Sequence, residues 1–296
     1  MRARLAAWLI VISLPIACAP GDGDTSARLQ TPTPTIIPSD TPASDEPLRF
    51  AVIGDFGTGW PVQHEIARRM CKWRERHPFD LVITTGDNIY PDGAPEHFQE
   101  KFFDPYRCLL EGGVEFHASL GNHDFFTDRG RPEIEEPVFG MPKRNYVLRT
   151  GGVRFVVADS NTLDREWLAE ALKPRPLDRW TIPVFHFPVY SPGTHRGSTP
   201  GYRPGLPRLF RSRGVDLVLN GHDHLYAVTK PLRKIRYVVS GGGGGGLYPC
   251  GQAWFSARCE SRYHFLYVMA GATEITVRAV PAAGRPFHRF ETSGRA

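Results

Sequence analysis

Side chains that can bind metal ions follow five apolar runs of the sequence, each at the point where the run ends. The first is Asp55, in Gly-Asp-Phe-Gly, and the second is Asp87, in Gly-Asp-Asn-Ile-Tyr. The other three runs end at Asn122 with His123, at His186, and at His222 with His224. Carboxylate, amide and imidazole groups are common metal ligands. One Gly-Asp turn or one histidine after a strand is usually structural, but five such sites in order favour a shared metal centre.

Asp87 stands on the loop that should leave a short buried strand at residues 79–83. In open α/β sheets, ligands bind outside the carboxyl ends of the strands. The two carboxylate oxygens of Asp87 are enough to bridge two metal ions. Tyr90, three residues later, offers a phenol oxygen that a trivalent metal can ionise and bind. We therefore expect a pair of metals with Asp87 between them.

Strands and amphipathic helices alternate along the chain and should position these residues. Strands are predicted at 48–54, 79–83 and 114–119, with helices at 62–75 and 96–109 between them. The later predicted elements are hairpin strands at 143–148 and 153–158, a helix at 163–172, a strand at 181–185, a helix at 204–213, and strands at 215–219, 225–229, 235–240, 263–270 and 274–280. This order predicts an α/β fold, a four-layer α/β/β/α sandwich of two mixed sheets flanked by helices.

Six consecutive glycines, Gly241 to Gly246, follow one of these strands. Glycine allows a positive φ and a close approach of the backbone to other groups. Two interpretations stay open at this point. The run is either a flexible loop between strands or a loop that passes close to a metal or a phosphate.

The first 47 residues differ from the rest in composition. Residues 1–19 carry two arginines and then a short apolar run, which is typical of a secretory signal and too short for a membrane span. The sequence Leu-Pro-Ile-Ala before Cys18 resembles a bacterial lipoprotein cleavage site, although ordinary cleavage near Ala17 or Ala19 is the alternative. Residues 20–47 are rich in Pro, Thr, Ser and Asp and predict a disordered tether. Residues 48–296 then form one domain.

The domain is basic. The first 47 residues hold three of the 36 basic and five of the 31 acidic residues, which leaves 33 basic against 26 acidic, about +7. This balance suits an anionic substrate or surface. The basic residues are scattered rather than clustered, so we expect no nucleic-acid partner and only a small phosphate-bearing substrate. Membrane contact is expected only through a lipid on Cys18.

Four cysteines follow Cys18, and an even number in an exported protein favours disulfides. Three pairings are open. Cys250 with Cys259 would form a local clasp, and Cys71 with Cys108 would then tie two helices. The expected location is extracytoplasmic, in the bacterial cell envelope or secreted.

In order and type, the motifs resemble those of the calcineurin-like metallophosphoesterase family. That family usually shows Asp-x-His, Gly-Asp, Gly-Asn-His-Asp/Glu, a single His and Gly-His-x-His. This chain departs at the first motif, where Gly57 stands in place of the histidine, and Tyr90 supplies a ligand instead. That substitution is the arrangement of the purple acid phosphatases. The chain resembles their small tartrate-resistant type over about residues 49–246, while the last 45 or so residues carry no recognised motif.

The resemblance implies two metal sites bridged by Asp87. One would use Asp55, Tyr90 and His224, hard ligands that suit Fe³⁺, and the other Asn122, His186 and His222, which suit Fe²⁺, Zn²⁺ or Mn²⁺. Two residues are expected to protonate the leaving alkoxide, first His123 and then His195, which follows a Tyr-Ser pair as in the tartrate-resistant type. The alternatives are that His123 only orients its neighbours and that His195 is an exposed loop residue.

Other polar residues near the motifs are given lesser roles. Asp223 is expected to form hydrogen bonds rather than to bind metal. Asn88 either contacts the phosphate or fixes its loop. The remaining histidines are expected to be structural or on the surface, namely His64, His77, His97, His117, His264 and His288.

The expected function is hydrolysis of phosphate monoesters by an exported acid phosphatase. A phosphodiesterase of the same superfamily is one alternative. A non-catalytic surface binding protein is another, but it should have lost ligands, and all seven are present. The sequence does not name the substrate, the second metal or the oligomeric state.

Overall fold

The structure, a computed structural model, describes residues 36–37, 46–195 and 204–294. The expected leader, with Cys18, and most of the expected tether lie outside these residues. Two residues of the expected tether form β1 (Ile36–Ile37), which pairs in parallel with β5. Within the described residues, none of the helices combines the length and the apolar character that a membrane span needs.

One sheet has six strands and carries the first metal-ligand motifs. Its strands, in spatial order, are β14 (His288–Ser293), β13 (Glu274–Pro281), β12 (His264–Ala270), β2 (Leu48–Ile53), β3 (Leu81–Thr84) and β4 (Glu115–His117). The strands β2, β3 and β4 run parallel, and β12 pairs antiparallel with β2. The carboxyl ends of β2, β3 and β4 therefore share one edge of the sheet.

The second sheet has eight strands and carries the later motifs. After β1 the order is β5 (Tyr146–Thr150), β6 (Val153–Val157), β7 (Trp180–Val184), β8 (Leu217–Asn220), β10 (Arg236–Ser240), β9 (Tyr226–Thr229) and β11 (Ser256–Glu260). The strands β6, β7, β8 and β10 are parallel. The strand β5 pairs antiparallel with β6, and β9 pairs antiparallel with both β10 and β11. This mixed order confirms the predicted pair of mixed sheets.

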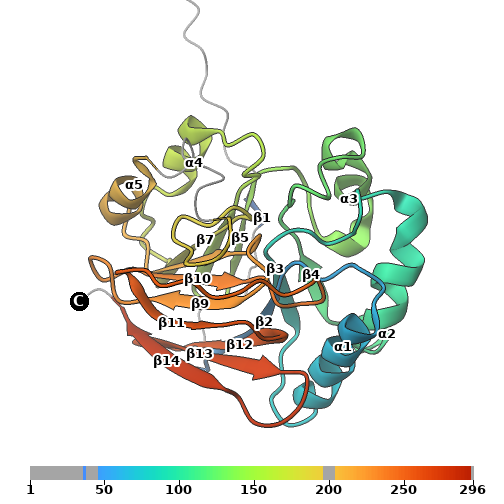
Figure 1. Cartoon of the computed structure of the whole chain (residues 1–296). Helices are drawn as coiled ribbons and strands as arrows, with labels where there is room; N and C mark the ends of the chain where they lie inside the picture. Colours follow the sequence, from blue (N-terminus) through green and yellow to red (C-terminus); the bar gives the residue numbers. More distant parts are fainter. Residues whose placement is uncertain (1–35, 38–45, 196–203, 295–296) are drawn as a thin grey trace, which may run out of the picture. The chain divides into compact units, whose positions relative to one another are not determined.

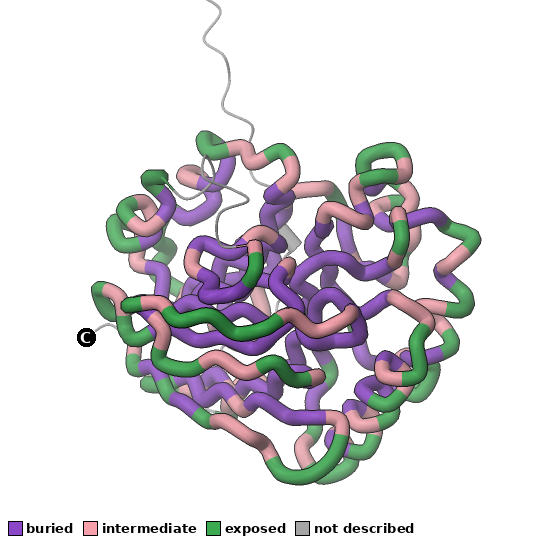
Figure 2. The backbone as a smooth tube through the Cα atoms, viewed as in Figure 1, coloured by how far each residue is buried: buried purple, intermediate pink, exposed green. Residues whose placement is uncertain are grey.

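The helices lie on the outer faces of the two sheets (Figure 1). They are α1 (Pro61–Arg74), α2 (Asp104–Glu111), α3 (Arg131–Glu135), α4 (Arg165–Ala171) and α5 (Leu206–Ser212), with short turns η1 (Pro95–His97), η2 (Gln99–Phe103), η3 (Asp128–Gly130) and η4 (Pro137–Phe139). Figure 2 shows the strands mostly buried, while the helices expose one side to solvent.

Alternating residues of single strands show why four layers form. In β6, Phe155 packs into the core between the sheets, where its ring lies 5.0 Å from that of Phe50. The next residue, Val156, belongs instead to a second core with Leu168 of α4 and Phe210 of α5. Successive side chains of a strand point to opposite faces, so each strand contributes to two apolar layers. The predicted four-layer α/β sandwich is confirmed.

The structure shows which cysteines pair, a choice that the sequence left open. Cys71 of α1 bonds Cys108 of α2, with Cα atoms 6.3 Å apart, and Cys250 bonds Cys259, with Cα atoms 5.9 Å apart. The first joins two helices and the second closes a local loop.

Candidate metal centre

All seven predicted metal ligands lie at the carboxyl ends of parallel strands. Asp55 follows β2, Asp87 and Tyr90 follow β3, and Asn122 follows β4 in the six-stranded sheet. From the eight-stranded sheet come His186 after β7, and His222 and His224 after β8. The strand ends of both sheets therefore supply one centre, as expected for ligand sites in α/β folds.

Three of these residues have backbone conformations that L-amino acids rarely adopt. The φ angles are 57° at Asp55, 52° at Asp87 and 71° at His222. Such left-handed conformations in residues other than glycine cost free energy and are concentrated at functional sites. Here they turn the chain sharply where the strand ends, so that the side chain points to the centre.

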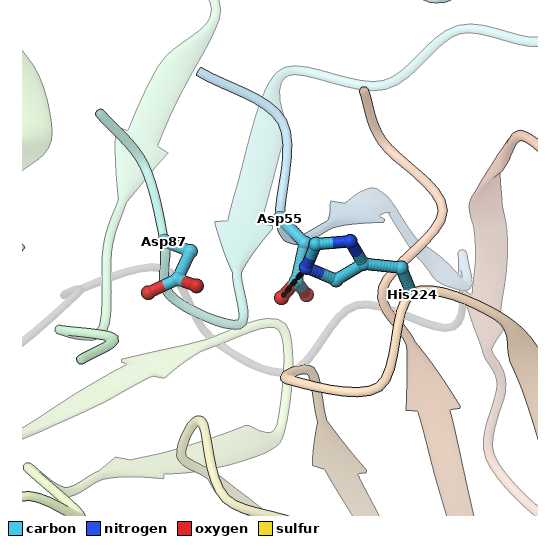
Figure 3. Close-up of side chains that lie close together, drawn as sticks. All are labelled: Asp55, Asp87 and His224. Atoms are coloured by element: carbon cyan, nitrogen blue, oxygen red, sulfur yellow. Dashed lines mark ion pairs between the residues drawn. The ribbon is translucent and has the colours of Figure 1, made fainter. Parts of the chain in front are cut away.

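The first cluster contains Asp55, Asp87, Tyr90 and His224. The Tyr90 hydroxyl lies 2.9 Å from Oδ2 of Asp87 and 3.0 Å from Nε2 of His224. The same His224 nitrogen lies 3.4 Å from Oδ1 of Asp55. Ligand atoms of Asp55, Asp87 and His224 all lie within 4.8 Å of one another. Figure 3 shows Asp55 and His224 pointing toward each other, with Asp87 on a separate loop.

The second cluster lies on the other side of Asp87. Nε2 of His186 is 3.0 Å from Oδ1 of Asn122 and 3.5 Å from Oδ1 of Asp87. Nδ1 of His222 is 3.2 Å from the same His186 nitrogen. Asp87 thus faces the first cluster with Oδ2 and the second with Oδ1. The structure brings together all seven predicted ligands in two groups that share this carboxylate.

Hydrogen bonds at the outer nitrogens fix how two of the histidines face the centre. Nδ1 of His186 lies 2.9 Å from the carbonyl oxygen of Thr85, and Nδ1 of His224 lies 2.8 Å from that of Gly246. A carbonyl oxygen only accepts hydrogen bonds, so each Nδ1 carries a hydrogen, and each Nε2 is turned inward, where its lone pair would bind a metal ion. These residues therefore fit a metal in the form in which imidazole binds it.

Burial and neighbouring charges shift the pKa values within the clusters. Burial, followed by the nearby imidazole of His186, lowers the pKa of His222 to about 2, so this ring is neutral. Burial, with the charges of Asp87 and Asp55, raises the pKa of Tyr90 well above its usual value. Its phenol keeps a proton unless a cation offsets these charges. Carboxylate, phenol and imidazole groups packed this closely are the donor set of a metal centre.

The two predicted proton donors contact different ligands of the centre. His123 donates its backbone N–H to Oδ1 of Asp87 at 2.9 Å, and its ring lies 4.4 Å from that of Tyr90. The ring of His195 lies 4.5 Å from that of His222. Each histidine therefore lies beside a different cluster.

Asp223 holds His195 in place. Its Oδ1 accepts the backbone N–H of His195 at 2.9 Å and lies 3.1 Å from Nδ1 of the same residue. Its other oxygen accepts the hydroxyl of Ser191. Asp223 is fully buried and forms hydrogen bonds, as expected, between its two histidine neighbours in the sequence.

Asn88 fixes its loop, which settles the choice that the sequence left open. Its amide nitrogen donates to the carbonyl of Ser119 at 2.9 Å and also contacts the carboxyl groups of Asp124 and Glu133. Its amide oxygen accepts the hydroxyl of Thr84 at 2.6 Å. These bonds use both ends of a fully buried side chain.

The glycine run passes close to the centre. A Cβ atom on Gly241 would lie 2.3 Å from the carbonyl oxygen of Asp223 and 2.9 Å from Oδ2 of Asp55. A Cβ atom on Gly245 would lie 2.6 Å from the His224 ring. Any side chain here would displace the site, so the close-approach interpretation is the one that the structure favours.

Tyr248 is a neighbour of the centre that sequence reasoning missed. Its ring stacks on His224 with centroids 4.3 Å apart and lies 5.0 Å from the ring of His195. Its backbone N–H donates to the carbonyl of His224 at 2.9 Å, and the Cys250–Cys259 disulfide begins two residues later, where the N–H of Gly251 donates to the carbonyl of Pro192 at 2.9 Å. The only signal in the sequence is its place between the glycine run and a cysteine.

Residues 48–226 match the family model described as calcineurin-like phosphoesterase, and the chain belongs to this family. Purple acid phosphatase 17 of Arabidopsis thaliana is 30% identical over 239 residues, which cover 68% of this chain and 69% of the relative. Tartrate-resistant acid phosphatase type 5 of Homo sapiens is 24% identical over 312 residues, which cover 88% of this chain and 95% of the relative. The resemblance predicted from the motifs is confirmed.

Two solved structures share the fold. Purple acid phosphatase PPD1 from yellow lupin has a TM-score of 0.74 at 18% identity and covers 86% of this chain and 55% of that one. GAP50, described as the anchor in the inner membrane complex of Plasmodium, has a TM-score of 0.72 at 18% identity. The match covers 85% of this chain and 90% of that one. Taken at the level of the family, the chain is a phosphatase-type hydrolase, and its purple acid phosphatase relatives imply a dinuclear metal centre.

Proposed function

We propose that this protein hydrolyses phosphate monoesters at acidic pH, using a dinuclear centre of Fe³⁺ with Fe²⁺, Zn²⁺ or Mn²⁺. The observation that carries the proposal is the position of the Tyr90 hydroxyl, within 3.0 Å of both Asp87 and His224. A phenolate beside two carboxylates is a hard, anionic donor set that suits a trivalent ion. Asp55, Tyr90, His224 and Asp87 would hold Fe³⁺, and Asp87, Asn122, His186 and His222 the divalent ion.

When bound, the metal pair would neutralise phosphoryl charge and lower the pKa of water, and a trivalent ion lowers it furthest, which favours an acidic optimum. The residues of the chain supply orientation and protons. The ring of His123 lies beside Tyr90 and the ring of His195 beside His222, so both would be near a phosphoryl group bound at the metals, where either would donate a proton to the leaving oxygen. Gly241 and Gly245 let the backbone pack directly against Asp55 and His224, so the run helps to hold these two ligands in place.

Metal analysis and a panel of phosphate esters across pH test this function. We expect iron in the purified protein, an activity maximum below neutral pH, and faster hydrolysis of p-nitrophenyl phosphate than of bis(p-nitrophenyl) phosphate. Faster hydrolysis of the bis ester would support a phosphodiesterase instead. Bound metals without hydrolysis of either ester would support a binding protein.

The phenolate assignment has its own readout. A tyrosinate bound to Fe³⁺ should give a visible charge-transfer band, and Tyr90→Phe should abolish it while the protein stays folded. Tyr263→Phe is the matched control, because Tyr263 lies outside both clusters and should leave the band unchanged. A band that persists in Tyr90→Phe would rule out this ligand.

We further propose that the protein is exported and anchored outside the cytoplasm by a lipid on Cys18. The supporting features are the signal-like start, the cleavage-site resemblance and two disulfides, which persist in oxidising compartments. Metabolic labelling with palmitate should mark the wild-type chain but not Cys18→Ser. Equal labelling of the two would exclude the anchor.

A further inference from the structure

A basic hollow lies at the far end of α1 from the metal centre. The side chains of Trp73 and His77 border two adjacent hollows of about 520 Å³ and about 110 Å³. The larger is closed by the β13–β14 hairpin, and the smaller lies against α1. This helix begins at Pro61, close behind Asp55, and its 14 residues rise about 21 Å. The hollows are therefore separate from the metal centre.

The borders of both hollows are cationic. Arg69 and Lys72 come from α1, Arg76 from the turn just after it, and Arg278 from β13. Among the described residues, none of these four cations forms an ion pair, and no carboxylate lines either hollow. A fifth cation, Arg289 of β14, pairs with Glu291 at 2.6 Å. Four unpaired positive charges in one place attract an anion.

Aromatic rings hold part of this charge in position. The rings of Trp73 and His77 stack with centroids 4.2 Å apart, and the guanidinium of Arg69 lies 5.2 Å from the Trp73 ring. Arg69 also donates to the carbonyl of Gly284 in the hairpin at 2.6 Å. A guanidinium fixed in this way loses little freedom when it binds an oxyanion, and its planar fork matches a phosphate.

Two buried donors at the same place have no acceptor within the described residues. They are Nε1 of Trp73, a side chain that is only 8% exposed, and Nε of Arg69. Buried N–H groups are nearly always hydrogen-bonded in folded proteins. Both side chains border the smaller hollow, so an anion bound there would lie beside two unsatisfied donors.

We propose that this hollow, the Trp73 site, binds a phosphate-bearing anion independently of the metal centre. A phosphate group carries one negative charge as a diester and up to two as the free anion, and its tetrahedral acceptor oxygens can contact several of these cations at once. The group is present in inorganic phosphate and in the head group of an anionic phospholipid, and both present the same chemistry to Arg69, Arg76 and Arg278.

Calorimetric titration of the metal-loaded protein with inorganic phosphate tests the proposal. We expect two phosphate sites in the wild type. Arg76→Gln should weaken one of them at least tenfold, while kcat for p-nitrophenyl phosphate stays unchanged. Arg68→Gln is the matched control, because Arg68 is exposed on α1, about two turns before Arg76, and borders neither hollow. Trp73→Phe, which keeps a ring but loses the N–H, should also weaken that site.

Sedimentation with vesicles distinguishes the two sources of the phosphate group. Binding to phosphatidylcholine vesicles containing phosphatidylglycerol, lost in Arg76→Gln but not in Arg68→Gln, would identify a lipid head group as the ligand. A second phosphate site without vesicle binding would identify the free anion. The proposal is overturned if the wild type shows one phosphate site and if its vesicle binding equals that of Arg76→Gln.

Discussion

The backbone N–H of Tyr90 donates a hydrogen bond to the carbonyl oxygen of Gly57 at 2.8 Å. A Cβ atom on residue 57 would lie 1.7 Å from the carbonyl oxygen of Asn88, in the loop that carries Tyr90. That loop therefore occupies the space that a side chain at position 57 would need. The absent histidine and the added tyrosine are parts of one arrangement, because the glycine makes room for the loop that brings the phenol to the centre.

Gly57→Ala should therefore damage both stability and the metal centre. The clash is with backbone atoms, which cannot rotate away, and overpacking of this kind typically costs about 1–3 kcal/mol. Because the loop must shift, the Tyr90 hydroxyl should move away from Asp87. Urea unfolding should show the loss of stability, and metal analysis should show a loss of bound metal.

Gly246→Ala is the control for this substitution. A Cβ atom on Gly246 would meet only a Trp60 ring atom, at 3.9 Å, which is ordinary van der Waals contact. This variant should be about as stable as the wild type. If Gly57→Ala matched it in stability and metal content, the proposed link between Gly57 and Tyr90 would be wrong.

The convergence of the ligands could be predicted from the sequence because it follows from topology. Asp55, Asp87 and Asn122 each end an apolar run, and parallel strands bring such ends to one edge. The contact between Gly57 and Asn88 could not be predicted, because it depends on how two loops pack. The same holds for Asn88 itself, whose partner Glu133 is 45 residues away.

Weak patterns explain the elements that sequence reasoning missed. The strand β11 (Ser256–Glu260) is largely exposed and has no apolar alternation, and β14 (His288–Ser293) buries only Phe290 and Thr292. The helix predicted at 96–109 is divided into η1, η2 and α2. Pro105 lacks the N–H needed to continue a helix, so α2 begins at Asp104, beside it. Tyr248 reaches the centre by packing on His224, 24 residues earlier in the chain, which no local pattern encodes.

Asp223→Ala should lower kcat about 10- to 100-fold, the usual cost of removing a partner that orients a functional histidine. Asp223 accepts two hydrogen bonds from His195, so the variant frees this ring from its position. If His195 protonates the leaving group, the loss should be larger for an alkyl phosphate than for p-nitrophenyl phosphate, whose leaving group needs little protonation.

His195→Ala should show the same dependence on the leaving group. The double variant Asp223→Ala/His195→Ala should have a kcat only slightly below that of His195→Ala alone, because both substitutions remove the same function. Metal content must stay at the wild-type level, since Asp223 lies between two proposed ligands. An equal loss for both substrates would mean that Asp223 does not act through proton transfer by His195.

Tyr248→Ala should raise KM for p-nitrophenyl phosphate several-fold and leave KM for glycerol phosphate nearly unchanged. Tyr248 stacks on His224 and lies beside His195, so its ring forms an aromatic side of the centre. Contact between aromatic rings contributes about 0.5–1.5 kcal/mol, up to roughly tenfold in affinity. Tyr248→Phe keeps the ring and should behave like the wild type. Equal changes for both esters would show that Tyr248 only supports His224.

Glu133→Gln should alter how stability depends on pH. Burial, followed by the charge of Asp124, raises the pKa of Glu133 well above 4.5. Above pH 4.5 the unfolded chain loses a proton that the folded chain retains, so the free energy of unfolding of the wild type should fall as pH rises until the folded pKa is reached. Glutamine does not ionise, and its amide oxygen can still accept the Asn88 N–H, which lies 2.9 Å from Glu133 in the wild type.

The stability of the wild type should therefore fall relative to Glu133→Gln by up to about 1.4 kcal/mol per pH unit above pH 4.5. Urea unfolding at pH 4.5, 5.5 and 6.5 measures this difference. Glu135→Gln is the control, at an exposed position of the same helix. Its free energy of unfolding should change with pH in parallel with that of the wild type. If Glu133→Gln also ran parallel, Glu133 would be ionised in the folded protein.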